Sequence, residues 1–321
     1  MLRLRPTSRV LLPTLCWLMF VSAALPAKYA GEAFSLGVGG RGLALGGSVV
    51  AGPFDGTAPY WNPAGMNLLE NRHFTAMHAE TFGSLLNHDF LAYVDSRSSA
   101  DTGLKPAYAL GFYLYYLGGG GIKITELDQE ARPYVVREES HGDWLFAAAV
   151  SRRLAADIHL GLTGRLIYRD LGVETGWGLS VDAGAVYQPC ECTSFGLMVT
   201  DITTGFIRYE GSTESIYPTV KPGLMLAHRH GDFVGRLTGS GDIKFENIRS
   251  GAQYWSGPLS LDTHFGGELE WRGMLFGRAG FDIGDFTAGV GVVYRHASFD
   301  FAYRDDDTFD ETLRFSAGFE F

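Results

Sequence analysis

The chain has little cysteine, little charge and no long hydrophobic run beyond its first residues. Its 3 Cys in 321 residues are too few to staple a disulfide scaffold. Charged residues make up only 19%, which excludes a charge-rich disordered chain. The formal net charge of -10 argues against binding to phosphate backbones, so we expect no nucleic-acid partner. No later segment offers the ~18 uninterrupted apolar residues of a spanning helix.

Motifs of known catalytic sites are also missing. Neither His-Glu-x-x-His nor Gly-x-Ser-x-Gly occurs in the chain. His73 and His78 can be drawn with Asp89 and a serine as a triad, but their spacing gives that drawing no support. We therefore expect a protein that is not an enzyme, with no catalytic residues.

Two small clusters carry groups that could bind a metal. Cys190 and Cys192 follow a proline, and two thiols alone make an incomplete zinc site. A bridge between them and a turn with two incidental thiols both remain open. Residues 305–307 and Asp310 are acidic, but their spacing misses the Ca²⁺-loop template. We expect no metal site and no cofactor.

The first residues form a targeting segment. Arg3, Arg5 and Arg9 precede an apolar stretch over residues 10–21, and small residues follow up to Ala27. This arrangement is typical of a secretory signal peptide, which we predict over residues 1–27. The protein is thus expected outside the cytoplasm, either soluble or as a β-barrel.

Alternation of apolar and polar residues decides in favour of the barrel. Along residues 177–187 one face carries Trp, Leu, Val, Ala, Ala and Tyr, while the other carries Gly, Ser, Asp, Gly and Val. Ten residue steps of ~3.3 Å, tilted by ~40°, span about 25 Å, which is the apolar height of an outer-membrane barrel with aromatic residues at both interfaces. The same alternation recurs down to the C-terminus.

Counting such segments predicts an all-β, transmembrane, antiparallel β-barrel of about 14 strands over residues 72–321, an even number as bacterial barrels require. The last segment places Phe319 and Phe321 on its apolar face. This ending resembles the C-terminal assembly signal of bacterial outer-membrane barrels. We expect short periplasmic turns at residues 272–273 and 283–284. The longer polar stretches are expected as external loops: 117–142, 202–219, 246–259 and 305–311.

A Gly-rich, weakly charged stretch over residues 34–69 precedes the barrel. Its Gly37-x-Gly39-x-x-Gly42 run formally matches a dinucleotide fingerprint, but no strand-to-helix context follows it. Glycines that pack tightly in a confined space explain it better. Further on, Pro63 biases Asn62 away from helix, and the Asn62 amide can bond nearby backbone to hold a turn.

Here the sequence resembles a family. Residues 40–47 (GRGLALGG) and 58–66 (APYWNPAGM) look like the N-terminus of FadL-like and PorV/PorQ-like outer-membrane proteins, the OMPP1/FadL/TodX superfamily. The resemblance implies a small hatch over residues 28–71 inside a fourteen-stranded barrel. Asn62, Pro63 and Ala64 match the hatch's Asn-Pro-Ala motif. Residues 178–205 are similar to the PorV/PorQ-like branch.

The resemblance implies a bacterial outer-membrane protein that moves hydrophobic or small amphipathic molecules, with the hatch as plug or gate. The alternative is a component of a type IX-like secretion system that binds cargo or partner proteins. Implied partners are outer-membrane lipid and lipopolysaccharide, the barrel-assembly machinery, and either a hydrophobic ligand or a secreted protein. An outer-membrane enzyme is a third class, disfavoured by the missing motifs.

Overall fold

The computed structural model describes residues 30–96, 108–247, 249–306 and 310–321. The predicted signal peptide lies outside these residues. Within them, no helix is both long and apolar enough to cross a membrane.

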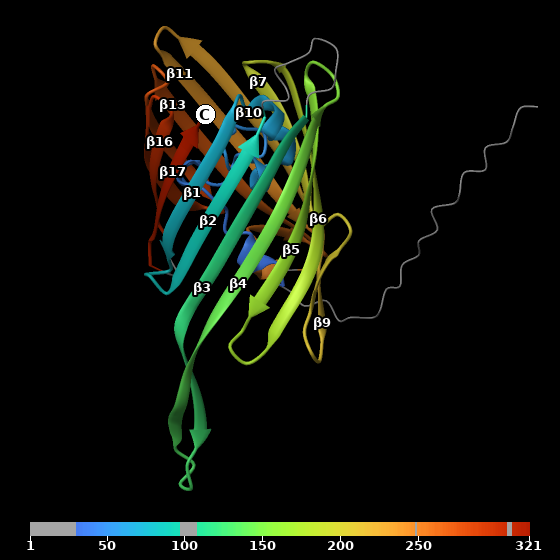
Figure 1. Cartoon of the computed structure of the whole chain (residues 1–321), viewed down its shortest axis with the longest axis vertical. Helices are drawn as coiled ribbons and strands as arrows, with labels where there is room; N and C mark the ends of the chain where they lie inside the picture. Colours follow the sequence, from blue (N-terminus) through green and yellow to red (C-terminus); the bar gives the residue numbers. More distant parts are fainter. Residues whose placement is uncertain (1–29, 97–107, 248, 307–309) are drawn as a thin grey trace, which may run out of the picture.

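The fold is a closed barrel of antiparallel strands (Figure 1). Its sheet has 17 strands, of which three are only three or four residues long, and the other fourteen form the wall, as predicted. The ring closes because β1 pairs with β17. The wall strands are β1 (Arg72–Thr81), β2 (Leu86–Asp95), β3 (Tyr108–Leu127), β4 (Pro133–Arg153), β5 (Ile158–Asp170), β6 (Thr175–Cys190), β7 (Thr193–Thr200), β10 (Thr219–His230), β11 (Phe233–Lys244), β13 (Leu259–Trp271), β14 (Leu275–Asp282), β15 (Asp285–Tyr294), β16 (Ala297–Arg304) and β17 (Thr312–Glu320).

The outer face of the wall is apolar. Phe112, Leu162, Phe265 and Val290 come from four different strands, and each keeps between 50% and 57% of its surface exposed. An apolar surface that encircles the molecule is far larger than the patches that soluble proteins leave in water. It matches the lipid-facing band of a membrane barrel.

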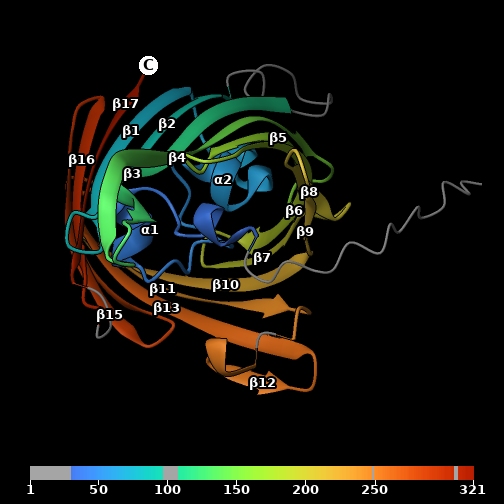
Figure 2. The ribbon, with the colours of Figure 1, turned by 90° about the horizontal axis from the view of Figure 1, so that it is seen from below.

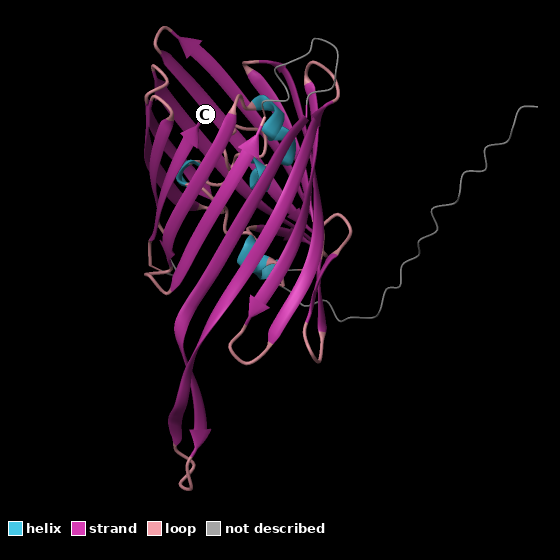
Figure 3. Cartoon of the chain, in the orientation of Figure 1, coloured by secondary structure: helices cyan, strands magenta, loops and turns pink. Residues whose placement is uncertain are grey.

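The two ends of the barrel differ. The start of β1 and the end of β17 pair at one end, which we call the C-terminal end. At the other, β3 and β4 continue past the wall as a projecting hairpin (Figures 1 and 3). We call this the hairpin end. The prediction of an external loop over residues 117–142 was therefore wrong. Ile122, Ile124, Val135 and Val136 favour strands, so the chain stays paired there after a β-bulge.

Other connections also depart from the prediction. The stretch 202–219 contains a small hairpin, β8 (Gly205–Arg208) with β9 (Thr213–Ile216). The stretch 246–259 contains η4 (Arg249–Gly251) and β12 (Tyr254–Ser256). Turns 272–273 and 283–284 border the same strand, β14, so they lie at opposite ends. Placing both at the periplasmic end was wrong because each antiparallel strand crosses the wall once.

Residues 30–69 lie inside the barrel, and we call them the hatch (Figure 2). Four short helices shape it: η1 (Glu32–Phe34), α1 (Gly40–Ala44), α2 (Ala58–Trp61) and η2 (Pro63–Leu68). The hatch begins near the hairpin end, where Glu32 contacts Lys244 at the end of β11. It finishes at the C-terminal end, beside the start of β1. One segment therefore runs along most of the lumen.

Candidate functional site

The Asn-Pro-Ala motif ties the hatch together and to the wall. The Asn62 side chain is fully buried. Its amide nitrogen donates to the carbonyl oxygens of Val50 in the hatch (2.9 Å) and Ala185 in β6 (3.2 Å), and its oxygen accepts from the Ala64 nitrogen (3.1 Å). The side chain therefore holds the local turn, as predicted, and joins it to two distant segments.

The wall makes room for this motif with glycines that face the lumen. A methyl group on Gly161 of β5 would collide with the backbone of Pro63 and Ala64, and one on Gly184 of β6 would collide with the Asn62 amide. The motif can approach the wall this closely only because both positions lack a side chain.

The glycines of the formal dinucleotide match have a packing role as well. A methyl group on Gly37 would lie 2.7 Å from the Trp61 indole, and one on Gly42 would lie 2.8 Å from it. The indole nitrogen donates to the Val38 carbonyl oxygen at 3.0 Å. These glycines therefore make a seat for Trp61 rather than a nucleotide site.

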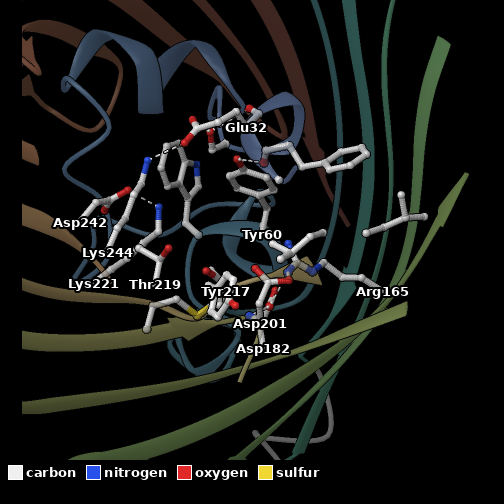
Figure 4. A pocket seen from close by; sticks show the side chains of 18 of the residues that line it. Glu32, Tyr60, Arg165, Asp182, Asp201, Tyr217, Thr219, Lys221, Asp242 and Lys244 are labelled. Carbon is white, nitrogen blue, oxygen red and sulfur yellow. Dashed lines mark hydrogen bonds and ion pairs between the residues drawn. The ribbon is translucent and has the colours of Figure 1, made fainter. Parts of the chain in front are cut away.

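A cavity of about 70 Å³ lies between the hatch and the wall toward the hairpin end (Figure 4). Tyr60 and Trp61 of α2 and Tyr113 of β3 give it an aromatic side. Tyr60 meets Trp61 edge to face, with ring centroids 5.2 Å apart, and Tyr113 with centroids 6.0 Å apart. The cavity can thus hold an apolar group against aromatic rings.

Charged side chains on the facing strands line the rest of the cavity. Arg165 of β5 pairs with Asp182 (2.8 Å) and Asp201 (2.6 Å). Across the cavity, Lys221 pairs with Asp242 (2.5 Å), both visible in Figure 4. Each of these two cations therefore faces at least one carboxylate, and the three carboxylates are in excess. Aromatic rings beside paired charges suit a molecule with an apolar body and a polar end.

The start of the hatch fills much of this space. The Tyr60 hydroxyl donates to the Phe34 carbonyl oxygen (2.8 Å) and accepts from the Gly37 nitrogen (3.1 Å). Burial raises the pKa of Tyr60, which keeps the phenol protonated as a donor. A cavity that holds benzene measures ~150 Å³. Since about 70 Å³ is less than half of that, a ligand of this size requires residues 30–35 to move.

A second cavity, of about 210 Å³, lies at the C-terminal end between the hatch and β1, β14 and β15–β17. Beside it, the buried Glu268 carboxylate accepts from Arg41 of the hatch (2.8 Å) and from Arg236 (2.7 Å) and Arg278 (2.7 Å) of the wall. This four-residue cluster fixes α1 to β11, β13 and β14.

Of the residues drawn as a triad, His78 and Asp89 meet, and His73 lies apart from them. His78 bonds Asp89 at 2.7 Å on the exposed outer face near the hairpin end. His73 lies toward the C-terminal end, where its ring bonds the Glu70 carbonyl oxygen at 2.6 Å and lines the second cavity. The alternation of the strand places positions 73 and 78 on opposite faces.

The remaining candidate residues lie at the ends of the wall. Cys190 and Cys192 form a disulfide at the β6–β7 turn. Phe319 and Phe321 lie exposed on the outer face with ring centroids 5.8 Å apart, and the Phe321 backbone bonds that of Arg72. Their role as an assembly signal stays a prediction.

Among the acidic residues of the last loop, Asp306 pairs with Arg304 at 3.0 Å, and residue 307 lies outside the described part of the chain. Within that part, no cluster of three or more His, Cys, Asp or Glu side chains is arranged to hold a metal ion.

Sequence reasoning overlooked the cavity. The sequence did indicate its charged residues, because the apolar–polar alternation along the strands places Arg165, Asp182, Lys221 and Asp242 on the lumen face. Which of them pair across strands depends on register, and that is visible only in the fold.

No family model and no curated protein matches the sequence. Solved structures do match. The CymD monoaromatic hydrocarbon channel superposes with a TM-score of 0.57 at 12% identity, covering 89% of this chain and 98% of that one. The P. putida toluene transporter TodX gives 0.54 at 12% identity, covering 89% and 99%. A Pseudomonas aeruginosa FadL homologue gives 0.51 at 10% identity, covering 87% and 97%. The likeness is one of fold, and it extends over nearly the whole of each barrel.

Proposed function

We propose that this protein is a bacterial outer-membrane channel of FadL-like type. It passes hydrophobic or small amphipathic molecules, with the hatch as its gate. The observation that carries the proposal is an aromatic cavity in the lumen that is partly filled by the first residues of the hatch. The shared fold with hydrocarbon channels, the apolar outer belt and the predicted signal peptide support the same function and the outer-membrane location.

The gate segment is residues 30–35, which a few polar contacts and the buried Phe34 ring hold in place. The Glu32 carboxylate pairs with Lys244 at 2.8 Å but is 41% exposed, and such a pair contributes ~0–1 kcal/mol. The backbones of Phe34 and Ala33 each accept one hydrogen bond, from Tyr60 and Tyr115. The Phe34 ring is also buried against Tyr115, so release of the segment exposes that ring at a cost of about 1.5–3 kcal/mol, which an apolar ligand in its place can offset. The buried Asn62 anchors the rest of the hatch.

A disulfide lock tests the gate. A Cβ built on Gly31 lies 3.9 Å from the Ile216 Cβ in β9, close to the ~3.8 Å that a disulfide needs. We expect Gly31→Cys with Ile216→Cys to crosslink the hatch to β9 when oxidised. The variants are made in a Cys190→Ser, Cys192→Ser background, so that the reductant acts on the new bridge alone.

Uptake of the apolar dye N-phenylnaphthylamine is then followed in Gram-negative cells that express each variant. The oxidised double-cysteine protein should lose the dye uptake of its parent, and reduction should restore it. Each single cysteine variant serves as the matched control and should transport in both conditions. Unchanged uptake through the crosslinked protein would contradict the gate, and no uptake by the parent would contradict the transport proposal.

The projecting β3–β4 hairpin favours a second candidate function, the binding of a secreted or partner protein. Leu127, Tyr134, Val135 and Val136 are between 47% and 68% exposed on it, beyond the wall. Exposed apolar groups gathered on one rim are typical of protein-binding surfaces. Crosslinking and pull-down from outer membranes should recover a partner with the full chain and lose it when residues 122–139 are replaced by a short turn. The partner-binding function would be excluded if the deletion variant still took up the dye and no partner were recovered with either the full chain or the variant.

A further inference from the structure

The lumen holds a series of neighbouring cavities along the hatch, and each shares lining residues with the next. The cavity near the hairpin end shares Ser35, Trp61 and Lys221 with a smaller cavity of about 40 Å³ deeper in the barrel. That cavity meets a crevice, too narrow for a water molecule, at Trp61. The crevice then shares Arg41 and Asp55 with the 210 Å³ cavity at the C-terminal end.

The Trp61 side chain occupies the junction of this series. It lines the 70 Å³ cavity, the 40 Å³ cavity and the crevice, which together lead from the hairpin end toward the C-terminal end. The indole packs directly against Gly37 and Gly42, and a side chain on either residue would collide with it. The site therefore accommodates a large ring. One hydrogen bond to Val38 and the edge of Tyr60 orient the ring there. The indole is thus placed to separate the cavities.

We propose that Trp61 is the barrier in an axial path that follows the hatch from one end of the lumen to the other. The proposal rests on the channel function above and specifies its route. Paired charges line the path on both sides of the indole, Lys221 with Asp242 toward the hairpin end and Arg278 with Asp300 toward the C-terminal end. Such a path takes small amphipathic molecules and hydrated ions in preference to long apolar chains.

Single-channel conductance of the purified protein in a planar bilayer in KCl tests the barrier. Trp61→Ala should raise the conductance several-fold over the parent, because removal of the indole joins the first cavity to the crevice. Trp61→Phe keeps a ring in the seat and should stay close to the parent, although it loses the bond to Val38. Trp177→Ala, which removes an indole from the outer face of β6, is the matched control and should change nothing.

A second readout separates a missing barrier from a released hatch. The Gly31→Cys, Ile216→Cys bridge should still form in Trp61→Ala, and a benzyl thiosulfonate reagent on Trp61→Cys should lower the conductance again. The proposal would be overturned if Trp61→Ala had the conductance of the parent while deletion of residues 34–69 raised the conductance. Loss of the bridge in Trp61→Ala would also overturn it, since Trp61 would then be an anchor. Conductance is read without the dye, so failed dye uptake in the parent leaves this test intact.

Discussion

The Asn62 side chain donates a hydrogen bond of 3.2 Å to the carbonyl oxygen of Ala185, a residue 123 positions later in β6. The same amide also holds Val50 and Ala64. A single buried side chain thereby connects two parts of the hatch with the wall. The Asn-Pro-Ala motif is thus an anchor, and the proposed gate segment, residues 30–35, lies elsewhere in the hatch.

Asn62→Ala should loosen the whole hatch. The change leaves two carbonyls and one N–H without their partner, and each buried unsatisfied group costs about 1–3 kcal/mol. We expect frequent large-conductance openings in a bilayer and faster proteolysis within residues 30–69. Asn87→Ala, at an exposed position of β2, is the control. Parent-like openings in Asn62→Ala would show that the anchor is dispensable.

Glu268→Gln should destabilise the barrel itself. Its fully buried side chain pairs with Arg41, Arg236 and Arg278. Arg236 and Arg278 keep a second carboxylate, Glu270 and Asp300, so the substitution removes the carboxylate that pairs with Arg41 and joins all three guanidinium groups. Breaking a buried ion pair from one side costs about 3–5 kcal/mol. The temperature at which the folded gel band converts to the unfolded band should fall. Glu138→Gln, on the exposed hairpin, should leave it unchanged, and equal temperatures for the two variants would refute the role of the cluster.

Tyr60→Phe should make the gate open more often. It removes the donor to Phe34 and the acceptor for Gly37, and a hydrogen bond contributes about 1 kcal/mol, or about fivefold in an equilibrium constant. Dye uptake should rise while the folded band keeps its melting temperature. The comparison is Tyr168→Phe, an exposed ring on the outside of β5. A fall in dye uptake would instead mean that the Tyr60 hydroxyl binds the ligand and does not hold the gate closed.

A pair of glycines tests how closely the hatch fits the wall. Gly196→Val of β7 faces the lumen and would push against the backbone of Val50 and Ala51, whereas Gly235→Val of β11 points outward with no heavy atom within 4 Å. Overpacking of this kind costs about 1–3 kcal/mol. The folded band should melt at a lower temperature in Gly196→Val alone. Equal effects at both sites would mean that the lumen has room to spare.

Local patterns determined the wall. Outer-face residues such as Leu162 and Phe265 must face lipid, and the period of two follows from strand geometry, so alternation alone located fourteen strands. It could not locate the hairpin, because a strand that leaves the membrane no longer alternates. There, Ile122 and Val135 keep the strands paired through their β-propensity.

The lumen was decided by tertiary structure. Asn62 and Pro63 mark a turn in the sequence, but the bond from Asn62 to Ala185 exists only because β6 passes beside the hatch. Likewise, Lys221 and Asp242 are lumen-facing by parity, and only register makes them partners rather than two unpaired charges. The physical reason is that alternation along a strand determines only which face of the wall a residue occupies. The closure of the barrel determines which strands and which parts of the hatch that residue contacts.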